Sequence, residues 1–150
     1  MITQRITHVE VESLGGECFL WQLDVGDPIE IEKMVNFIKG ELGFVDILFN
    51  NAGVTQHIDF FDIENDDWDR IHRVNAKGAF FCMQKVARLM VETGRAGRII
   101  NMGSIAGKGY RRASNAAYSA SKGAVISMTY SAASVLSQHD INVNAICPGM

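Results

Sequence analysis

Short apolar runs alternate along this chain with longer segments in which apolar residues recur every three or four positions. The short runs have the length and composition of buried β-strands; they span residues 17–23, 45–49, 98–102 and 141–146. The longer segments have the period of helices that bury one face; they span residues 3–14, 29–42, 66–93 and a segment around residue 118 that reaches about 138. This alternation predicts an α/β fold, a doubly wound parallel sheet with helices on both faces and right-handed crossovers.

Residues that favour helix ends or interrupt helices refine these boundaries. Asp27 is placed to cap the second predicted helix, and Pro28 stands at its first helical position. Within the longest predicted helix, Asn75 and Gly78 are two residues that helix propensity disfavours. The longest helix therefore carries a local irregularity in its sequence.

Polar or glycine-containing turns follow the predicted strands. They are Asp24, Asn51-Ala52-Gly53, Ser104 and Pro148-Gly149. Ligands of open parallel sheets bind beyond the carboxyl ends of the strands, which meet at one edge. The sequence therefore predicts a binding site at this edge.

A tyrosine and a lysine stand four residues apart, as Tyr118 and Lys122. On a helix this spacing stacks the two side chains on one face. A nearby ammonium stabilises the phenolate, so the tyrosine can act as an acid or base near neutral pH, whereas an unperturbed tyrosine has a pKa of about 10. The same spacing also describes an ordinary pair on a solvated helix face. Tyr110 is a weaker candidate, because Ser114 rather than a lysine stands four residues beyond it.

Composition excludes several classes of function. The chain has 150 residues, 47% of them hydrophobic and 21% charged, which is enough for one globular domain, expected over residues 1–150. A net charge of −3 leaves no basic footprint for nucleic acid or an anionic membrane, and no signal peptide or membrane span is recognisable. The three cysteines and four histidines are scattered without metal-ligand spacing, so no metal is expected and a cytoplasmic setting is the default.

Five short motifs occur in a fixed order on this framework. They are Asn50-Asn51-Ala52-Gly53, Asn75 within Val74-Asn75-Ala76-Lys77-Gly78, Ser104 after residues 99–103, Tyr118-x-x-x-Lys122, and Pro148-Gly149. Together they resemble the short-chain dehydrogenase/reductase family over essentially the whole chain, each at its expected place in the strand and helix order. The resemblance implies a Rossmann-like fold and an enzyme dependent on NAD or NADP.

The resemblance also implies a role for each catalytic candidate. Tyr118 would be the acid/base, and Lys122 would lower its pKa and hydrogen-bond the nicotinamide ribose. Ser104 would hold the substrate oxygen. The backbone carbonyl of Asn75 would hold a water that links Lys122 to solvent, which would explain the irregular helix as a deformation kept for function.

Cofactor contacts and assembly follow from the same resemblance. Besides Tyr118 and Lys122, the implied cofactor-binding residues are Asp24 and Val25 at the adenine, Asn51, Ala52 and Gly53 beside the adenosine ribose, and Pro148 and Gly149 at the nicotinamide. The helix at 66–93 and the helix of Tyr118 resemble those that pair in homodimers and homotetramers of the family.

The substrate is expected to be a small secondary alcohol or ketone. Residues 141–149 resemble polyol, sugar-alcohol or small diol dehydrogenases, and also 3-oxoacyl carrier-protein reductases. A catalytically silent interaction module remains the alternative.

The family's phosphate-binding glycine loop, its NAD/NADP-selecting residue and its substrate-covering segment have no counterpart here. The chain is therefore expected to be a central fragment, incomplete at both ends of the fold and inactive alone. Arg111 and Arg112 are expected on a solvated surface, with a role at the substrate mouth as the lesser possibility.

Overall fold

The centre of the structure is a parallel β-sheet of three strands in the order β1-β2-β3. The computed structural model describes residues 2–110 and 114–149. The strands are β1 (Ile47–Asn50), β2 (Gly97–Met102) and β3 (Ile141–Ile146). In register, Leu48 lies opposite Ile99, and Ile99 lies opposite Val143. The predicted parallel, Rossmann-like sheet is confirmed.

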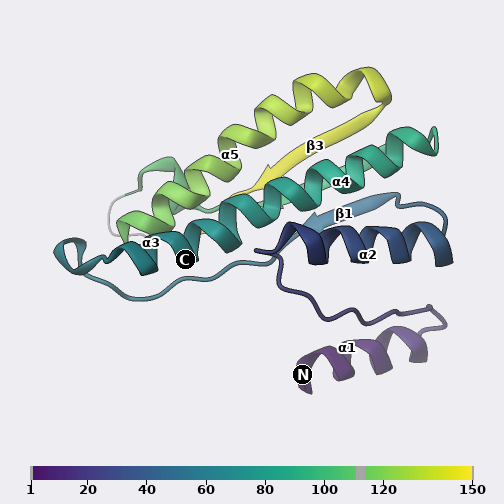
Figure 1. Cartoon of the computed structure of the whole chain (residues 1–150), viewed down its shortest axis with the longest axis horizontal. Helices are drawn as coiled ribbons and strands as arrows, with labels where there is room; N and C mark the ends of the chain where they lie inside the picture. Colours follow the sequence, from purple (N-terminus) through teal and green to yellow (C-terminus); the bar gives the residue numbers. More distant parts are fainter. Residues whose placement is uncertain (1, 111–113, 150) are drawn as a thin grey trace.

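Three helices cover one face of this sheet. The α-helices are α1 (Ile2–Ser13), α2 (Pro28–Glu41), α3 (Asn65–His72), α4 (Ala79–Glu92) and α5 (Ala116–Leu136). Figure 1 shows α2, α4 and α5 side by side, and their apolar side chains form a single core with Ile99 and Val143 of the sheet. Two right-handed crossovers that step in the same direction place α4 and α5 on the same face, and α2, which precedes β1, packs beside α4.

The opposite face of the sheet is open among the described residues. Ile47 is 63% exposed, Phe49 is 49% exposed and Ile146 is 48% exposed. Because side chains alternate along a strand, these residues point away from the helices that cover Leu48 and Ile99. Helices were predicted on both faces of the sheet. In the described part of the chain they cover one face.

The strand predicted at 17–23 is wrong. This stretch runs as an irregular extended segment, and the rings of Phe19 and Trp21 contact Phe37 of α2 at centroid distances of 6.0 and 4.7 Å. An apolar run reports burial, but a strand also needs a neighbour to accept and donate its backbone hydrogen bonds. Among the described residues no strand pairs with residues 17–23, and the apolar run packs on a helix instead.

The predicted helix boundaries at α2 are confirmed. The Asp27 carboxylate accepts a hydrogen bond of 2.8 Å from the Ile29 N–H, and Pro28 occupies the first position. Gly43 follows the helix with a φ of +82° and donates its N–H to the Ile38 carbonyl at 3.0 Å. A left-handed residue after a helix end is most readily a glycine, as observed.

The long helix predicted at 66–93 is divided in the structure. Between α3 and α4 lies a π-helical stretch, Arg73–Gly78, hereafter the π segment. Asn75 and Gly78, the two residues that propensity disfavoured, both lie inside it. A π-helical turn widens the helix locally and is frequent at functional sites. The sequence thus located the irregularity but not its geometry.

None of the helices among residues 2–110 and 114–149 is both long and apolar enough to traverse a bilayer. Arg111 and Arg112, expected on a solvated loop, lie outside the described residues.

Candidate active site

The Asn75 side chain joins three parts of the chain at the centre of the π segment. It is 1% exposed. Its Oδ1 accepts a hydrogen bond of 2.7 Å from the Val54 N–H, and its Nδ2 donates to the Val54 carbonyl at 2.9 Å. Nδ2 also donates to Ser121 Oγ of α5 at 3.1 Å. One buried amide therefore fixes the loop after β1 to both the π segment and α5.

Gly53 lies where that loop passes closest to the polar groups. A Cβ added at Gly53 would stand 3.3 Å from Asn75 Oδ1 and 3.4 Å from Lys122 Nζ. These distances are tight, so a side chain here would displace the amide or the ammonium. Asn51 and Ala52, which precede it, are exposed. The loop backbone can therefore be approached from solvent and lies against the predicted catalytic residues on its inner side.

Lys122 is a buried cation. It is 3% exposed, and its Nζ donates a hydrogen bond of 2.7 Å to the Met102 carbonyl at the end of β2. Nζ lies 5.7 Å from the centroid of the Tyr118 ring, which confirms that the two side chains share one helix face. Burial lowers the pKa of the Lys122 ammonium, and an electrostatic contribution from Cys147 offsets part of that shift. An ammonium has three donors, so two remain for other oxygen atoms.

Tyr118 lies in the first turn of α5 and its backbone is held at both ends. Its N–H donates to the Asn115 side-chain oxygen at 2.8 Å, which makes Asn115 the N-cap of α5. Its carbonyl accepts a hydrogen bond of 2.7 Å from Ser121 Oγ. Asn115 also donates to the Gln56 carbonyl at 2.6 Å, so the helix start is tied to the loop beyond Val54. Sequence reasoning assigned no role to Asn115 or Ser121.

Ser104 begins a 3-10 turn, Ile105–Lys108, directly after β2. Its Oγ accepts a hydrogen bond of 3.1 Å from the Ala106 N–H within this turn. The Ile105 N–H donates to the Pro148 carbonyl at 3.1 Å, which brings Ser104 beside the predicted nicotinamide turn at Pro148 and Gly149. The same 3-10 turn packs on α5, because a Cβ added at Gly107 would lie 2.5 Å from the Lys122 carbonyl carbon.

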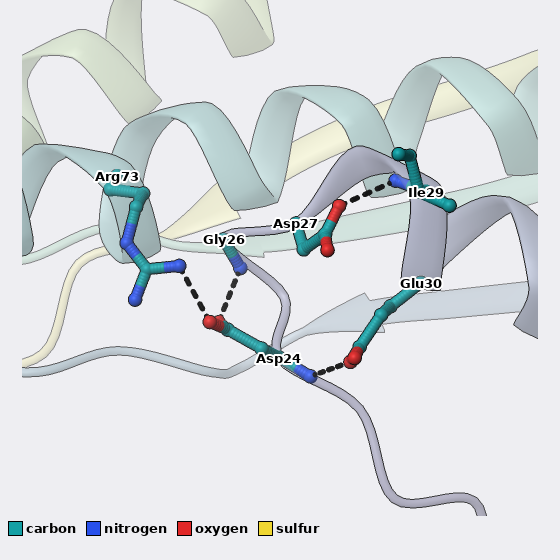
Figure 2. Close-up of polar contacts among 6 residues, drawn as sticks. All are labelled: Asp24, Gly26, Asp27, Ile29, Glu30 and Arg73. Atoms are coloured by element: carbon teal, nitrogen blue, oxygen red, sulfur yellow. Dashed lines mark hydrogen bonds and ion pairs between the residues drawn. The ribbon is translucent and has the colours of Figure 1, made fainter.

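Asp24 and Val25 contact the two ends of the π segment, Arg73 and Gly78. The Asp24 carboxylate pairs with Arg73 at 2.5 Å and accepts the Gly26 N–H at 2.8 Å (Figure 2). The hydrogen bond from Arg73 is the largest cause, and that from Gly26 the next, of a pKa of Asp24 below its usual value. The Val25 carbonyl would lie 2.7 Å from a Cβ added at Gly78. The Asp24 turn therefore touches both Arg73 and Gly78.

A cavity of about 650 Å³ opens beside the first turn of α5. Its lining includes the following polar residues: Thr55, Gln56, His57, Asp59, Ser114 and Asn115. The Thr55 and Ser114 hydroxyl oxygens face each other at 3.5 Å. Donors and acceptors of this kind suit a small hydroxylated molecule better than an apolar one.

The predicted site residues thus form one connected set at the carboxyl edge of the sheet. Gly53, Asn75, Lys122 and Tyr118 are joined directly or through Ser121. Ser104 and Pro148 lie beside this group, because the turn after β2 packs on the backbone of Lys122. Asp24 and Val25 contact the π segment, which contains Asn75. Asn50 has a structural part instead, since its Nδ2 donates to Asn101 Oδ1 at 2.9 Å and to the Ala79 carbonyl at 3.1 Å.

A parallel sheet with helices and polar strand ends at its carboxyl edge is the architecture of a doubly wound α/β protein. The chain belongs to the short-chain dehydrogenase family, whose model matches residues 3–150. It is 44% identical over 128 residues to a sorbitol dehydrogenase of Cereibacter sphaeroides, covering 85% of this chain and 50% of that protein. It is 42% identical over 129 residues to a galactitol 2-dehydrogenase of Agrobacterium fabrum, covering 86% and 50%.

Other similar proteins include a reductase and two solved structures. A 3-oxoacyl-[acyl-carrier-protein] reductase of Staphylococcus epidermidis is 37% identical over 140 residues, covering 93% of this chain and 57% of that protein. A short-chain dehydrogenase/reductase from Mycobacterium marinum superposes with a TM-score of 0.92 at 32% identity, covering 97% and 59%. An NAD+-bound xylitol dehydrogenase superposes with a TM-score of 0.90 at 35% identity, covering 97% and 56%. The chain spans about half the length of the curated relatives that it matches.

Proposed function

We propose that the protein containing this chain interconverts a secondary alcohol and a ketone, with Tyr118 as the acid/base. The observation that carries the proposal is the buried Lys122 ammonium beside the Tyr118 ring. Among the described residues no carboxylate lies within ion-pair distance of Lys122. A buried cation without an anionic partner is costly. The phenolate that forms when Tyr118 gives its proton to a substrate carbonyl would supply an anion beside Lys122.

The other residues then have distinct parts in the reaction. Tyr118 Oη takes the proton of the substrate hydroxyl in oxidation and returns a proton to the carbonyl oxygen in reduction. Ser104 holds that oxygen while its bond to carbon changes order. The Asn75 side chain fixes the loop at Val54, and its backbone carbonyl holds a water for proton exchange with Lys122. The widened π turn supports this last assignment, because it leaves the regular helical hydrogen-bond pattern at Asn75.

The residues present fit a nicotinamide nucleotide. The absence of a Cβ at Gly53 leaves the loop backbone close to Lys122, and two donors of Lys122 remain for ribose hydroxyls. We assign Asn51, Ala52 and Gly53 to the adenosine ribose, and the turn at Pro148-Gly149 to the nicotinamide. When bound, the nicotinamide ring accepts or donates the hydride. The NAD+-bound xylitol dehydrogenase among the similar structures supports this cofactor class, with NAD or NADP as the two alternatives.

The substrate class that we propose is a polyol or sugar alcohol. The sorbitol and galactitol dehydrogenases among the relatives support it, and so do the hydroxyl, amide and carboxylate groups in the lining of the cavity beside α5. A 3-oxoacyl carrier-protein reductase is the second candidate, supported by the relative of that name. The same protein would then reduce a 3-oxoacyl thioester rather than oxidise a polyol.

The test uses the whole protein that contains this chain. Sorbitol, galactitol, xylitol and an acetoacetyl thioester are supplied with NAD or NADP, and the absorbance of the reduced nicotinamide is followed. We expect turnover with a polyol and a loss of at least about a hundredfold in Tyr118→Phe, which removes only the acid/base hydroxyl. Near-normal turnover in that variant would reject the role of Tyr118. Turnover with the thioester alone would select the second candidate. Nucleotide binding without turnover on any substrate would favour a catalytically silent module.

We also propose that the protein assembles as a homo-oligomer through α4 and α5. A groove of about 430 Å³ runs between these helices, with Met83, Ala87 and Val91 on one side and Met128, Ala132 and Val135 on the other. Its lining also carries Arg88 and Glu92. A two-fold axis brings the same patch of two copies together, so opposite charges on one patch can face each other across the interface.

A further inference from the structure

The two ends of the π segment hold one turn of the chain, Asp24-Val25-Gly26. At one end the Arg73 side chain crosses Gly26, where an added Cβ would lie 2.4 Å from Nη1 and 3.0 Å from Cγ. At the other end Gly78 lies against the Val25 carbonyl, which an added Cβ would approach to 2.7 Å. Both contacts need a glycine. The turn is thus packed against the segment that contains Asn75.

Arg73 also sets the direction of the Asp24 carboxylate. Oδ2 accepts from Arg73 Nη1, and Oδ1 accepts the Gly26 N–H at 2.8 Å. The Asp24 N–H donates to the Glu30 carboxylate at 2.5 Å (Figure 2). An ionised carboxylate has about four acceptor sites, so the oriented group keeps capacity for a further donor. Its side chain is 47% exposed, which leaves that capacity open to a ligand.

An ion pair this exposed contributes little to stability. Exposed pairs are typically worth below about 1 kcal/mol because water and salt screen them. What the Arg73 contact does supply is a second fixed point for the carboxylate, at Oδ2, in addition to the Gly26 N–H that holds Oδ1. The adenine amino group can donate a hydrogen bond, and a carboxylate held in one direction can accept it.

We propose that Arg73 is a positioning residue for the adenosine half of the cofactor, acting by holding the Asp24 carboxylate. This inference rests on the proposed function, which assigns Asp24 and Val25 to the adenine. Arg73 touches neither the reacting atoms nor Tyr118. Its effect is therefore on nucleotide affinity, and the turnover of the fully loaded enzyme is unchanged.

The main variant is Arg73→Met, which keeps the length of the side chain and removes its charge and donors. In the whole protein we expect the Kd for NAD or NADP, and the Kd for AMP, to rise about tenfold, the order of one charge-assisted hydrogen bond. The kcat at saturating cofactor stays within about twofold because the chemistry is untouched. Titration calorimetry gives both Kd values. Arg73→Lys, which keeps a donor, recovers part of the affinity.

Two further variants separate this role from a general effect of charge on nucleotide binding. Lys77→Met removes the same charge from the π segment at an exposed residue whose side chain makes no hydrogen bond or ion pair among the described residues, so its Kd stays at the wild-type value. Asp24→Asn weakens binding, and adding Arg73→Met to it weakens binding no further, since Arg73 acts through Asp24. An equal loss in Lys77→Met, or additive losses in the double variant, would overturn the proposal.

The outcome is distinguishable from a failure of the proposed function. If wild type turns over an alcohol with the cofactor and Arg73→Met leaves both Kd values unchanged, only this inference fails. If wild type binds neither nicotinamide nucleotide nor AMP, the proposed function fails, and the inference fails with it. Thermal unfolding of Arg73→Met and Arg73→Lys at the wild-type temperature shows that any change in Kd is local.

Discussion

Asn75 and Ser121 are joined by a buried hydrogen bond of 3.1 Å between the π segment and α5. The residues stand 46 positions apart in the chain. The same Ser121 hydroxyl donates to the Tyr118 carbonyl at 2.7 Å. The Ser121 hydroxyl therefore links the Asn75 side chain to the backbone of Tyr118, the proposed acid/base.

Replacing Ser121 by alanine removes both of these hydrogen bonds. We expect Ser121→Ala to lower the free energy of unfolding by about 1–2 kcal/mol, the usual cost of a lost buried hydrogen bond. We expect kcat of the whole protein to fall as well, because Tyr118 and Asn75 lose their common support. Urea unfolding and steady-state kinetics measure the two effects. The matched control is Ser127→Ala, at an exposed position of the same helix, which should be near neutral in both. Equal effects in the two variants would contradict the role of Ser121.

Gly53 is a second place where a single methyl group has a defined consequence. In Gly53→Ala the new Cβ would stand 3.3 Å from Asn75 Oδ1 and 3.4 Å from Lys122 Nζ. We expect a destabilisation of about 1 kcal/mol from overpacking and weaker cofactor binding, because the loop or the ammonium must shift. Gly40→Ala in α2 is the control, since nothing lies within 4 Å of its added Cβ. It should stabilise the fold by about 0.5–1 kcal/mol, as alanine favours a helix over glycine. A neutral Gly53→Ala would contradict the close approach.

Ionisation of Asp24 links its contact with Arg73 to pH. The hydrogen bonds from Arg73 and Gly26 lower the pKa of Asp24 from 3.8, so the folded state binds this proton less readily than the unfolded state. The resulting stabilisation is present above pH 3.8 and is lost as the pH falls through the folded pKa. Urea unfolding of wild type and Asp24→Asn should show wild type more stable at neutral pH, with the difference shrinking in that acid range. The effect is small because the pair is exposed. A difference that is independent of pH would contradict the contact.

Much of the fold and the site could be predicted because the signals were local. Helical period, the Asp27 cap and the alternation of short apolar runs with helical segments all depend on residues close in the chain, and they correctly predicted α2 and the parallel sheet. The binding site at the carboxyl edge stays a prediction. The N-cap of α5 at Asn115 had a readable signal as well, since asparagine is among the preferred capping residues. The Tyr118 and Lys122 spacing alone described a surface pair equally well, whereas α5 buries Lys122 against the end of β2.

Features that depend on distant partners could not be predicted. The stretch at 17–23 has the composition of a strand, but a strand exists only where a neighbour accepts its hydrogen bonds. Asn75 and Gly78 marked the irregular helix, yet its π geometry is held by Val54 and Val25, which are far away in sequence. The pairing of Arg73 with Asp24, 49 residues apart, likewise leaves no local trace.

The groove between α4 and α5 leads to a prediction about assembly. Val135 is 59% exposed and lines this groove, where we propose that a second copy of the chain binds. A glutamate in this largely apolar groove would have to lose its hydration in both copies on association, which opposes assembly even where Arg88 of the lining pairs with it. We therefore expect Val135→Glu to shift the whole protein from its oligomer to a smaller species in sedimentation velocity.

Val9→Glu provides the control for that experiment. Val9 is 65% exposed on α1, outside the groove, so the same substitution there introduces the same charge without touching the proposed interface. It should leave the sedimentation coefficient unchanged. A wild-type protein that sediments as a monomer, or a Val135→Glu variant that keeps the wild-type mass, would exclude a second copy from the groove.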